Sequence, residues 1–255
     1  MDIAPAQIER AATHLHAAQH IAILTGAGVS KESGVPTFRD ALTGLWAQYN
    51  PQELATPSAF RRSPKLVWDW YEWRREIIGK SQPNAGHIAL ADLHQHKDSV
   101  WLITQNVDDL HEQAGSQNVI HLHGNIAANK CFADCQGTPT LIDVATLAYE
   151  DVPRCPFCNA YVRPDVVWFG EQLPREALGT ASVYSRDCDV MLVVGTSGMV
   201  SPASQLPGIA KQHGATLIEV NPDTSMITPL VDLHLQAPSG AVLPRVIRAL
   251  RDLAN

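Results

Sequence analysis

The 255-residue sequence lacks any apolar run long enough to cross a bilayer and any segment dense in lysine or arginine. Its longest apolar stretches, such as residues 190–194, fall far short of the roughly 20 residues that a membrane helix requires. The net charge of −7 also leaves no excess of the positive charge that electrostatic nucleic-acid binding requires. We therefore expect neither a membrane partner nor direct nucleic-acid binding.

The beginning of the chain, residues 1–5, has no basic region followed by an apolar stretch, so a secretory signal is not expected. Hydrophobic residues make up 45% of the chain and charged residues 18%, which is the composition of a folded protein and not of a disordered one. The sequence is therefore expected to be a cytoplasmic protein in a reducing compartment, and a monomer.

Cysteine is scarce, but four of the five cysteines fall into two close pairs. Cys131 and Cys135 form a C-x3-C pair, and Cys155 and Cys158 form a C-x2-C pair. Two such knuckles can point four thiolates at one zinc ion, and four sulfur ligands leave no position for water, so the site would be structural. Two disulfides or four unrelated thiols are the alternatives, of which a reducing compartment disfavours the first. Cys188 stands apart and is expected to be a small buried residue.

Short apolar runs alternate with amphipathic segments along the chain, which predicts an α/β fold: a Rossmann-like parallel sheet with helices on both faces. Strands are expected at residues 21–24, 100–104, 188–194 and 216–220, and helices at residues 7–18, 58–79, 85–96, 202–213 and 241–253.

Two segments interrupt this alternation. Residues 40–80 hold most of the tryptophans and are expected to be a helical insertion, and residues 125–165 hold the paired cysteines and are expected to be a zinc module. Together they would form a small domain. The remaining segments would form the Rossmann-like, nucleotide-binding domain, with the substrate site in the cleft between the two domains. These segments are residues 1–39, 81–124 and 166–255.

Each expected strand ends in small or polar residues. Because open α/β sheets bind ligands beyond the carboxyl ends of their strands, these clusters are expected to converge. The clusters are Gly26-Ala27-Gly28, Gln105-Asn106, Gly195-Thr196-Ser197 and Asn221.

The Gly26-x-Gly28 turn allows close backbone approach to a pyrophosphate, although alone it is a weak signal. Lys31 stands where a third glycine is usual, and no acidic residue directly follows the expected strand at 100–104. A dinucleotide site is compatible with these residues, whereas a hydride-transferring dehydrogenase is disfavoured.

Several motifs follow one another over nearly the whole chain. They are Gly26-Ala27-Gly28-Val29-Ser30 running to Pro36-Thr37-Phe38-Arg39, Thr104-Gln105-Asn106-Val107-Asp108, His121-Leu122-His123-Gly124, the paired cysteines, Phe169-Gly170-Glu171, Gly195-Thr196-Ser197 and Val220-Asn221. Together and in this order they resemble the signatures of the sirtuins, the NAD-dependent protein deacylases.

The resemblance implies that NAD is a co-substrate and that the products are free lysine, nicotinamide and O-acyl-ADP-ribose. His123 would be the general base, a role that suits an imidazole with an ordinary pKa of about 6.5. Asn106 would position ribose or water, Asp108 the nicotinamide amide, and Gln105 the ribose hydroxyls. Phe38 would shield the reacting face, and Arg39 would hold its loop and the phosphates.

The resemblance also implies which further residues contact NAD. Ser197, Asn221 and Ser239 match positions near the adenosine half, although Asn221-Pro222 is also a common turn and Ser239-Gly240 a common helix cap. The remaining implied NAD contacts are Gly26, Ala27, Gly28, Ser30, Gly195 and Thr196.

Tyr71 and Arg74 are three residues apart and would share a helix face, where a phenol and a guanidinium together suit a carboxylate. This Tyr-x-x-Arg pattern resembles sirtuins that remove succinyl and malonyl groups, and Ala55 matches a position where those members keep a small side chain. An arginine beside an aromatic ring on a helix surface is the plain alternative. Arg75 is expected to face elsewhere.

The segment Phe169-Gly170-Glu171, after an expected strand at residues 166–168, resembles the segment that pairs with substrate backbone by strand addition. Acyl-lysine proteins would therefore be the partners. Two other functions use the same nucleotide site: an NAD-consuming hydrolase or ADP-ribosyl transferase, and a catalytically idle zinc-containing NAD sensor. Tyr71 and Arg74 disfavour the first of these, and His123 and Asn106 the second.

Overall fold

The computed structural model describes residues 3–37 and 47–254, which divide into two compact units. Unit 1 comprises the described residues of 1–37, Ser81–Leu122 and 174–255. Unit 2 comprises the described residues of 38–80 together with His123–Leu173. The chain therefore enters unit 2 twice and returns each time to unit 1.

Unit 1 is built on a parallel sheet of six strands in the order β3-β2-β1-β6-β7-β8. The strands at its centre are almost continuously apolar, and all five residues of β6 are buried, as expected of strands covered on both faces. The strands are β1 (His20–Thr25), β2 (Ser99–Thr104), β3 (Val119–His121), β6 (Val190–Val194), β7 (Thr216–Val220) and β8 (Leu233–Leu235).

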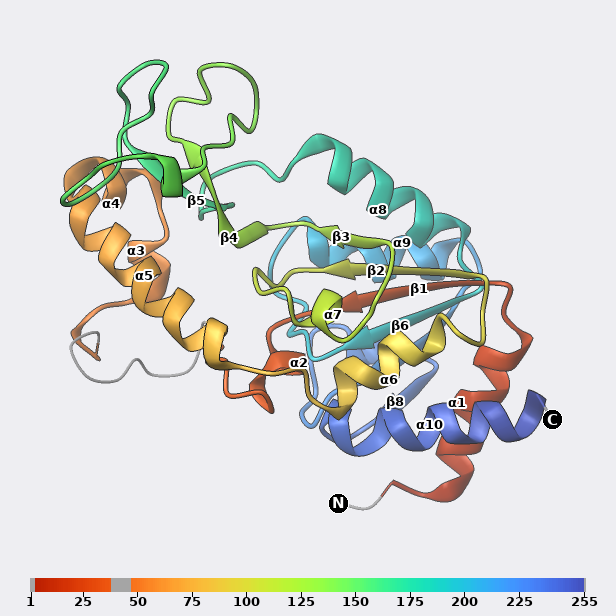
Figure 1. The fold of residues 1–255 in the computed structure, drawn as a ribbon. Coiled ribbons are helices and arrows are strands. Elements are labelled where there is room, and N and C mark those ends of the chain that lie inside the picture. Colours follow the sequence, from red (N-terminus) through yellow and green to blue (C-terminus); the bar gives the residue numbers. More distant parts are fainter. Residues whose placement is uncertain (1–2, 38–46, 255) are drawn as a thin grey trace. The chain divides into compact units, whose positions relative to one another are not determined.

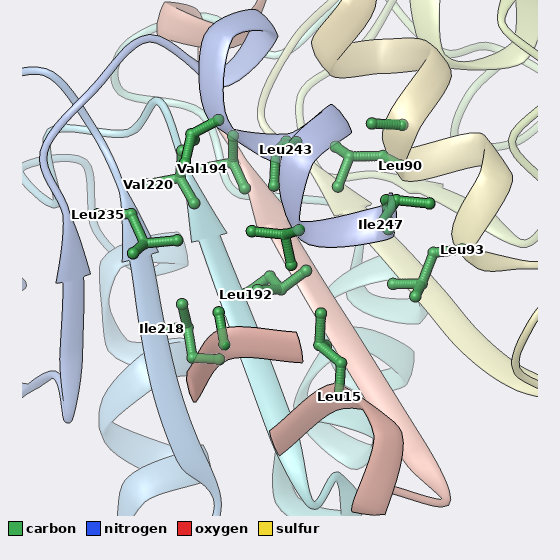
Figure 2. Packing of buried hydrophobic residues seen from close by; sticks show 14 of the residues in the cluster. Leu15, Leu90, Leu93, Leu192, Val194, Ile218, Val220, Leu235, Leu243 and Ile247 are labelled. Atoms are coloured by element: carbon green, nitrogen blue, oxygen red, sulfur yellow. The ribbon is translucent and has the colours of Figure 1, made fainter. Parts of the chain in front are cut away.

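Successive residues of β1 supply two separate cores, because side chains alternate across a strand. Ile21 and Ile23 pack with Leu15 of α1 (Pro5–Ala17), and α6 (Ala85–Leu93) and α10 (Ser239–Ala254) complete this core. Figure 2 shows its apolar side chains interlocking above the sheet. Ala22 faces the other core, on the side of α9 (Leu206–Gln212) and α8 (Arg175–Asp187). The helices thus lie on both faces of the sheet (Figure 1).

Short elements complete unit 1: α2 (Gly28–Lys31) and α7 (Leu110–Gln113) follow the ends of β1 and β2, and η3 (Ala203–Gln205) and η4 (Thr228–Leu230) are single 3-10 turns. Local chemistry explains where α6 begins. The side chain of Asn84 accepts hydrogen bonds from the backbone of Gly86 and His87, and the His87 ring accepts one from the Asn84 backbone. This reciprocal arrangement is a capping box.

The described residues of unit 2 form three α-helices and a two-stranded antiparallel sheet. The helices are α3 (Pro51–Leu54), α4 (Pro57–Arg62) and α5 (Pro64–Lys80), and the strands are β4 (Gly124–Cys131) and β5 (Val162–Val166). A register shift between Asn125 and Asn129 bends β4, and η2 (Val144–Thr146) lies in the connection between the strands.

The expected fold class is confirmed, but several elements differ. The single helix expected at 58–79 is two helices, because Pro64 lacks an N–H and excludes helical conformation at Ser63. The strand expected at 166–168 ends at Val166. Sequence analysis missed β3, β4, β8, α3 and α8, and most of β5. The expected domain boundaries differ from the observed units at residues 123–124 and 166–173, which lie in unit 2.

No helix in the described ranges combines the length and apolarity that a membrane crossing demands.

Candidate active site

The glycine-rich loop after β1 packs directly on the turn after β6. The amide of Gly28 donates to the Gly195 carbonyl at 2.8 Å, and a Cβ atom at Gly28 would lie 2.7 Å from the same oxygen. A Cβ atom at Gly26 would lie 2.8 Å from the side chain of Thr196. Glycine is therefore required here for contact between two loops, which leaves bare backbone at the edge where the strands end.

Thr196 joins the ends of three strands. Its hydroxyl accepts a hydrogen bond from Gln105 Nε2 at 2.9 Å, and its carbonyl accepts one from Asn221 Nδ2 at 2.9 Å. Gln105 follows β2, Thr196 follows β6 and Asn221 follows β7. The structure thus brings these three predicted site residues together, as the convergence of strand ends predicts.

Ser30, Asn106 and Asp108 form a second buried group at the same edge. Asn106 Nδ2 donates to the Ser30 hydroxyl at 3.0 Å, and this hydroxyl donates to Asp108 Oδ2 at 3.0 Å. Asp108 Oδ1 also accepts from the amide of Leu110 at 3.3 Å. Burial raises the pKa of Asp108 above its usual range. The side chains of this group are therefore held in one arrangement by their own hydrogen bonds.

Two buried histidines support this group. His87 Nε2 lies 3.4 Å from the Ser30 hydroxyl, and His111 Nε2 lies 3.0 Å from the Thr25 hydroxyl. Burial lowers the pKa of His87 to about 4 and holds the pKa of His111 well below its usual value. Both rings are therefore neutral near pH 7, and their centroids lie 4.8 Å apart.

His121 and His123 differ in their surroundings. His121 ends β3, and its Nε2 lies 2.5 Å from Glu112 Oε1. Burial lowers the pKa of His121, but the hydrogen bond and negative charge of Glu112 outweigh it, so the pKa lies above its usual value. His123 begins the second segment of unit 2 and is half-buried, and its carbonyl accepts from Val167 at 2.9 Å. His123 is the residue that the resemblance to the sirtuins implies as the general base, and the structure leaves this role a prediction.

The His121–Glu112 pair should make stability depend on pH. Because the folded-state pKa of His121 is raised, its contribution is complete below about pH 6.5 and is lost as pH rises through the raised value. His121→Gln should therefore lower the free energy of unfolding by about 0.5–1 kcal/mol at pH 6 and by less at pH 9. Denaturant unfolding across this range measures the difference. In a Glu112→Gln background, the change in the free energy of unfolding caused by His121→Gln should no longer depend on pH. If His121→Gln destabilises the unmodified protein more at high pH than at low pH, the pairing is contradicted.

Other predicted NAD contacts fall into two groups. Phe38 and Arg39 lie outside the described residues. The hydroxyl of Ser239 donates to Glu32 Oε1 at 3.1 Å at the beginning of α10, where the Gly240 amide donates to the same oxygen at 2.9 Å. Ser239 thus belongs to a helix-capping arrangement. The carbonyl of Ser197 accepts from the Met226 amide at 3.1 Å, which ties this turn to the loop after β7.

The four paired cysteines converge in unit 2. Their sulfur atoms all lie within 4.8 Å of one another, with Cys131 3.5 Å from Cys158 and Cys135 3.7 Å from Cys155. A tetrahedron with Zn–S bonds of about 2.3 Å has edges of about 3.8 Å, so these residues fit one zinc ion. All four are free cysteines, so neither of the two alternative disulfides is formed. The separate Cys188 is buried, as expected.

Tyr71 and Arg74 lie on α5 beside aromatic rings. The guanidinium of Arg74 lies 5.1 Å from the ring centroid of Trp70 and 5.6 Å from that of Tyr71. Tyr71 is fully buried, which raises the pKa of its phenol, whereas Arg74 is partly exposed. A ligand would therefore meet Arg74 first, and would reach the Tyr71 hydroxyl only by entering the packed interior.

The side chain of Arg75 faces β4. Its Nε donates to the Ile126 carbonyl at 2.7 Å, and its Nη2 donates to Asn129 Oδ1 at 2.6 Å. It also pairs with Glu72 at 2.5 Å. Arg75 therefore anchors α5 to β4, and its replacement would disturb the fold of unit 2.

The segment after β5 is built around a buried arginine that sequence analysis missed. The guanidinium of Arg163 pairs with both carboxylate oxygens of Glu171, at 2.5 and 3.0 Å, and lies 3.2 Å from the ring centroid of Trp168. The amide of Trp168 donates to Glu171 Oε2 at 2.8 Å. The carboxylate of Glu171, a predicted substrate contact, therefore stabilises its own loop through Arg163 and the Trp168 amide. Phe169 is 42% exposed on this loop, and its amide donates to the Ala55 carbonyl at 2.9 Å.

Sequence signals for the missed residues differ. His87 stands three residues after Asn84, a spacing typical of a helix-capping pair, so its position was open to prediction. Arg163 and Trp168 meet only through a turn of the folded chain, and no periodic pattern connects them.

These features define an α/β protein with a dinucleotide-type site at the sheet edge and a structural zinc module. The amides, hydroxyls and single carboxylate at that edge fit the ribose hydroxyls and the nicotinamide amide of NAD. The model of the Sir2 family matches residues 26–202. The chain belongs to this family.

Known relatives and solved structures are similar over almost the full chain. The NAD-dependent protein deacylase of Ralstonia nicotianae is 53% identical over 244 residues, 96% of each chain. The NAD-dependent protein deacylase 1 of Pseudomonas aeruginosa is 49% identical over 92% of this chain and 95% of its own. A Sir2 homologue solved as an NAD complex has a TM-score of 0.88 at 43% identity, covering 97% of this chain and 95% of its own.

Proposed function

We propose that this protein is an NAD-dependent protein-lysine deacylase that prefers acyl groups ending in a carboxylate. Membership of the Sir2 family supports the reaction, and its relatives bear the name NAD-dependent protein deacylase. The acyl preference rests on one observation: the half-buried Arg74 and the phenol of Tyr71 lie together on α5, with the guanidinium 5.6 Å from the Tyr71 ring centroid.

When bound, NAD supplies the acceptor for the acyl group. Gln105, Asn106 and Asp108 would hold its nicotinamide and ribose groups, and the hydrogen bonds of Ser30 keep Asn106 and Asp108 in fixed positions. The imidazole of His123 would take a proton from a ribose hydroxyl. A neutral imidazole near pH 7 is suited to this transfer.

Acyl-lysine proteins would be bound along the segment that follows β5. Gly170 has a φ of 88°, which turns the chain after the exposed Phe169, and Arg163 and Glu171 brace the turn. A solved complex with a TM-score of 0.81 and 31% identity contains Sir2, a p53 peptide and NAD+. Backbone pairing at such a segment gives affinity with little dependence on sequence, so many proteins could serve as substrates.

A carboxylate at the end of the acyl chain would be recognised by Arg74 through charge and by Tyr71 through a hydrogen bond. Guanidinium groups bind carboxylates in a fixed fork, and hydrogen bonds to charged groups are the stronger ones. An acetyl group ends in a methyl and gains neither contact. Ala55 is small and buried, and a larger side chain at this position would leave less space for a longer acyl chain.

Arg74→Met should lower kcat/KM for a succinyl-lysine peptide by about 100-fold, because a carboxylate left without its partner in a partly buried site is costly. For an acetyl-lysine peptide the change should stay below about threefold, since no charge is lost there. Parallel assays of peptide mass and released nicotinamide measure both values.

The control is Arg62→Met, which removes an exposed arginine of α4 and should leave the two substrates in their original ratio. Equal losses for both peptides in Arg74→Met would remove Arg74 from acyl recognition. Nicotinamide release without any change in peptide mass would favour the hydrolase or transferase alternative.

A further inference from the structure

The hydroxyl of Tyr71 takes part in one hydrogen bond whose direction is fixed by chemistry. The indole Nε1 of Trp168 lies 2.8 Å from this hydroxyl. An indole N–H can only donate, so the Tyr71 oxygen must accept. The phenol proton cannot point towards Trp168 and is directed to the opposite side of the oxygen.

That proton meets no acceptor in the part of the chain that the structure describes, where Trp168 is the single hydrogen-bond partner of Tyr71. The side chain of Tyr71 has 0% exposure, so bulk water does not satisfy it either. A buried donor without an acceptor is unfavourable. Within the described residues this arrangement leaves the phenol proton available to an acceptor that binds there.

Trp168 is itself held firmly in place. The Arg163 guanidinium lies over its ring, and its backbone amide is bound to Glu171, which Arg163 pairs with in turn. Phe60 packs on the same indole with ring centroids 5.3 Å apart. The donor that faces Tyr71 is thus fixed before any substrate arrives.

We propose that Trp168 is a specificity-determining positioning residue, which occupies the acceptor side of the Tyr71 hydroxyl and so commits the phenol proton to the carboxylate of an acidic acyl group. This inference rests on the proposed function and extends it. A carboxylate accepts hydrogen bonds and donates none, so a hydroxyl whose proton is directed away from Trp168 is matched to it. An acetyl group places no acceptor there.

Trp168→Phe removes the indole N–H and lets the Tyr71 proton turn away from the ligand. The ratio of kcat/KM for succinyl- over acetyl-lysine peptides should fall by about 5- to 10-fold. In a Tyr71→Phe background the same change should alter the ratio by less than about twofold, because the group through which Trp168 acts is absent.

Two further variants separate the N–H from its ring. Trp101→Phe is the tryptophan control: it changes an indole of β2 in unit 1 that stacks on Tyr184, and should change the ratio by less than about twofold. Trp168→3-benzothienylalanine keeps the bicyclic ring and removes only the N–H. It should reproduce the fall seen with Trp168→Phe, even where phenylalanine disturbs the packing.

An unchanged ratio in Trp168→3-benzothienylalanine would overturn the proposal, as would an equal fall with and without the Tyr71 hydroxyl. If Arg74→Met abolishes the succinyl preference while the benzothienylalanine variant retains it, Trp168 has no such role and the proposed function stands. Absence of succinyl preference in the unmodified protein would reject both.

Discussion

Replacing His123 by alanine should lower deacylation by about 1,000-fold, the scale on which a general base contributes, while NAD still binds. The predicted NAD contacts at the sheet edge belong to unit 1, and the hydrogen bonds among Gln105, Thr196 and Asn221 and between Asn106 and Ser30 do not involve His123. Peptide mass spectrometry measures turnover, and calorimetry measures the affinity for NAD. His123→Tyr should give the same result.

His213→Ala is a suitable control, because this exposed histidine lies at the end of α9 and its ring bonds only to the Ile209 carbonyl in its own helix. His213→Ala should keep near-normal turnover. Comparable turnover in His123→Ala would remove His123 from its role. Loss of NAD binding in the same variant would instead place this residue in the binding of the dinucleotide.

Replacing Cys155 by serine should abolish zinc binding and unfold much of unit 2. A structural zinc site contributes about 10–16 kcal/mol of binding free energy, and that energy is coupled to folding. Cys155 is buried and its sulfur lies 3.7 Å from that of Cys135, so a serine cannot be moved out of the cluster into water. Metal analysis should give one zinc per unmodified chain and less than about one tenth of that for the variant.

Cys188→Ala is the matched control, since Cys188 is buried in unit 1 and its thiol bonds to the Ser185 carbonyl. This variant should retain a full zinc content and a normal unfolding transition. A Cys155→Ser protein that keeps both its zinc and the stability of the unmodified chain would contradict the assignment of the cluster.

The features that sequence analysis predicted are those with a local cause. Apolar runs such as residues 190–194 have a length and composition typical of a buried strand, and the spacing of the cysteine pairs favours a common centre. The convergence of Gln105, Thr196 and Asn221 followed from the rule that parallel strands end at one edge.

The features that were missed depend on contacts between distant segments. The strands β3 and β8 have three residues each, too few to establish an alternating pattern. The hydrogen bond between Trp168 and Tyr71 joins two segments of unit 2 that are distant in the sequence, and no residue spacing predicts that they meet. Arg75 was expected to face away from Tyr71 and Arg74, but its contact with the carbonyl groups of β4 could not be predicted, because β4 is distant in the sequence.

The position of β1 within its sheet has a consequence for synthesis of the chain. β1 pairs on one side with β2 and on the other with β6. Both segments of unit 2 lie between β1 and β6 in the sequence. Because translation runs from the N-terminus, every residue of unit 2 is synthesised before β6, the strand that pairs with one edge of β1. A pairing between such distant segments closes a large loop and is slow. Metal loading can therefore precede completion of the sheet on the ribosome.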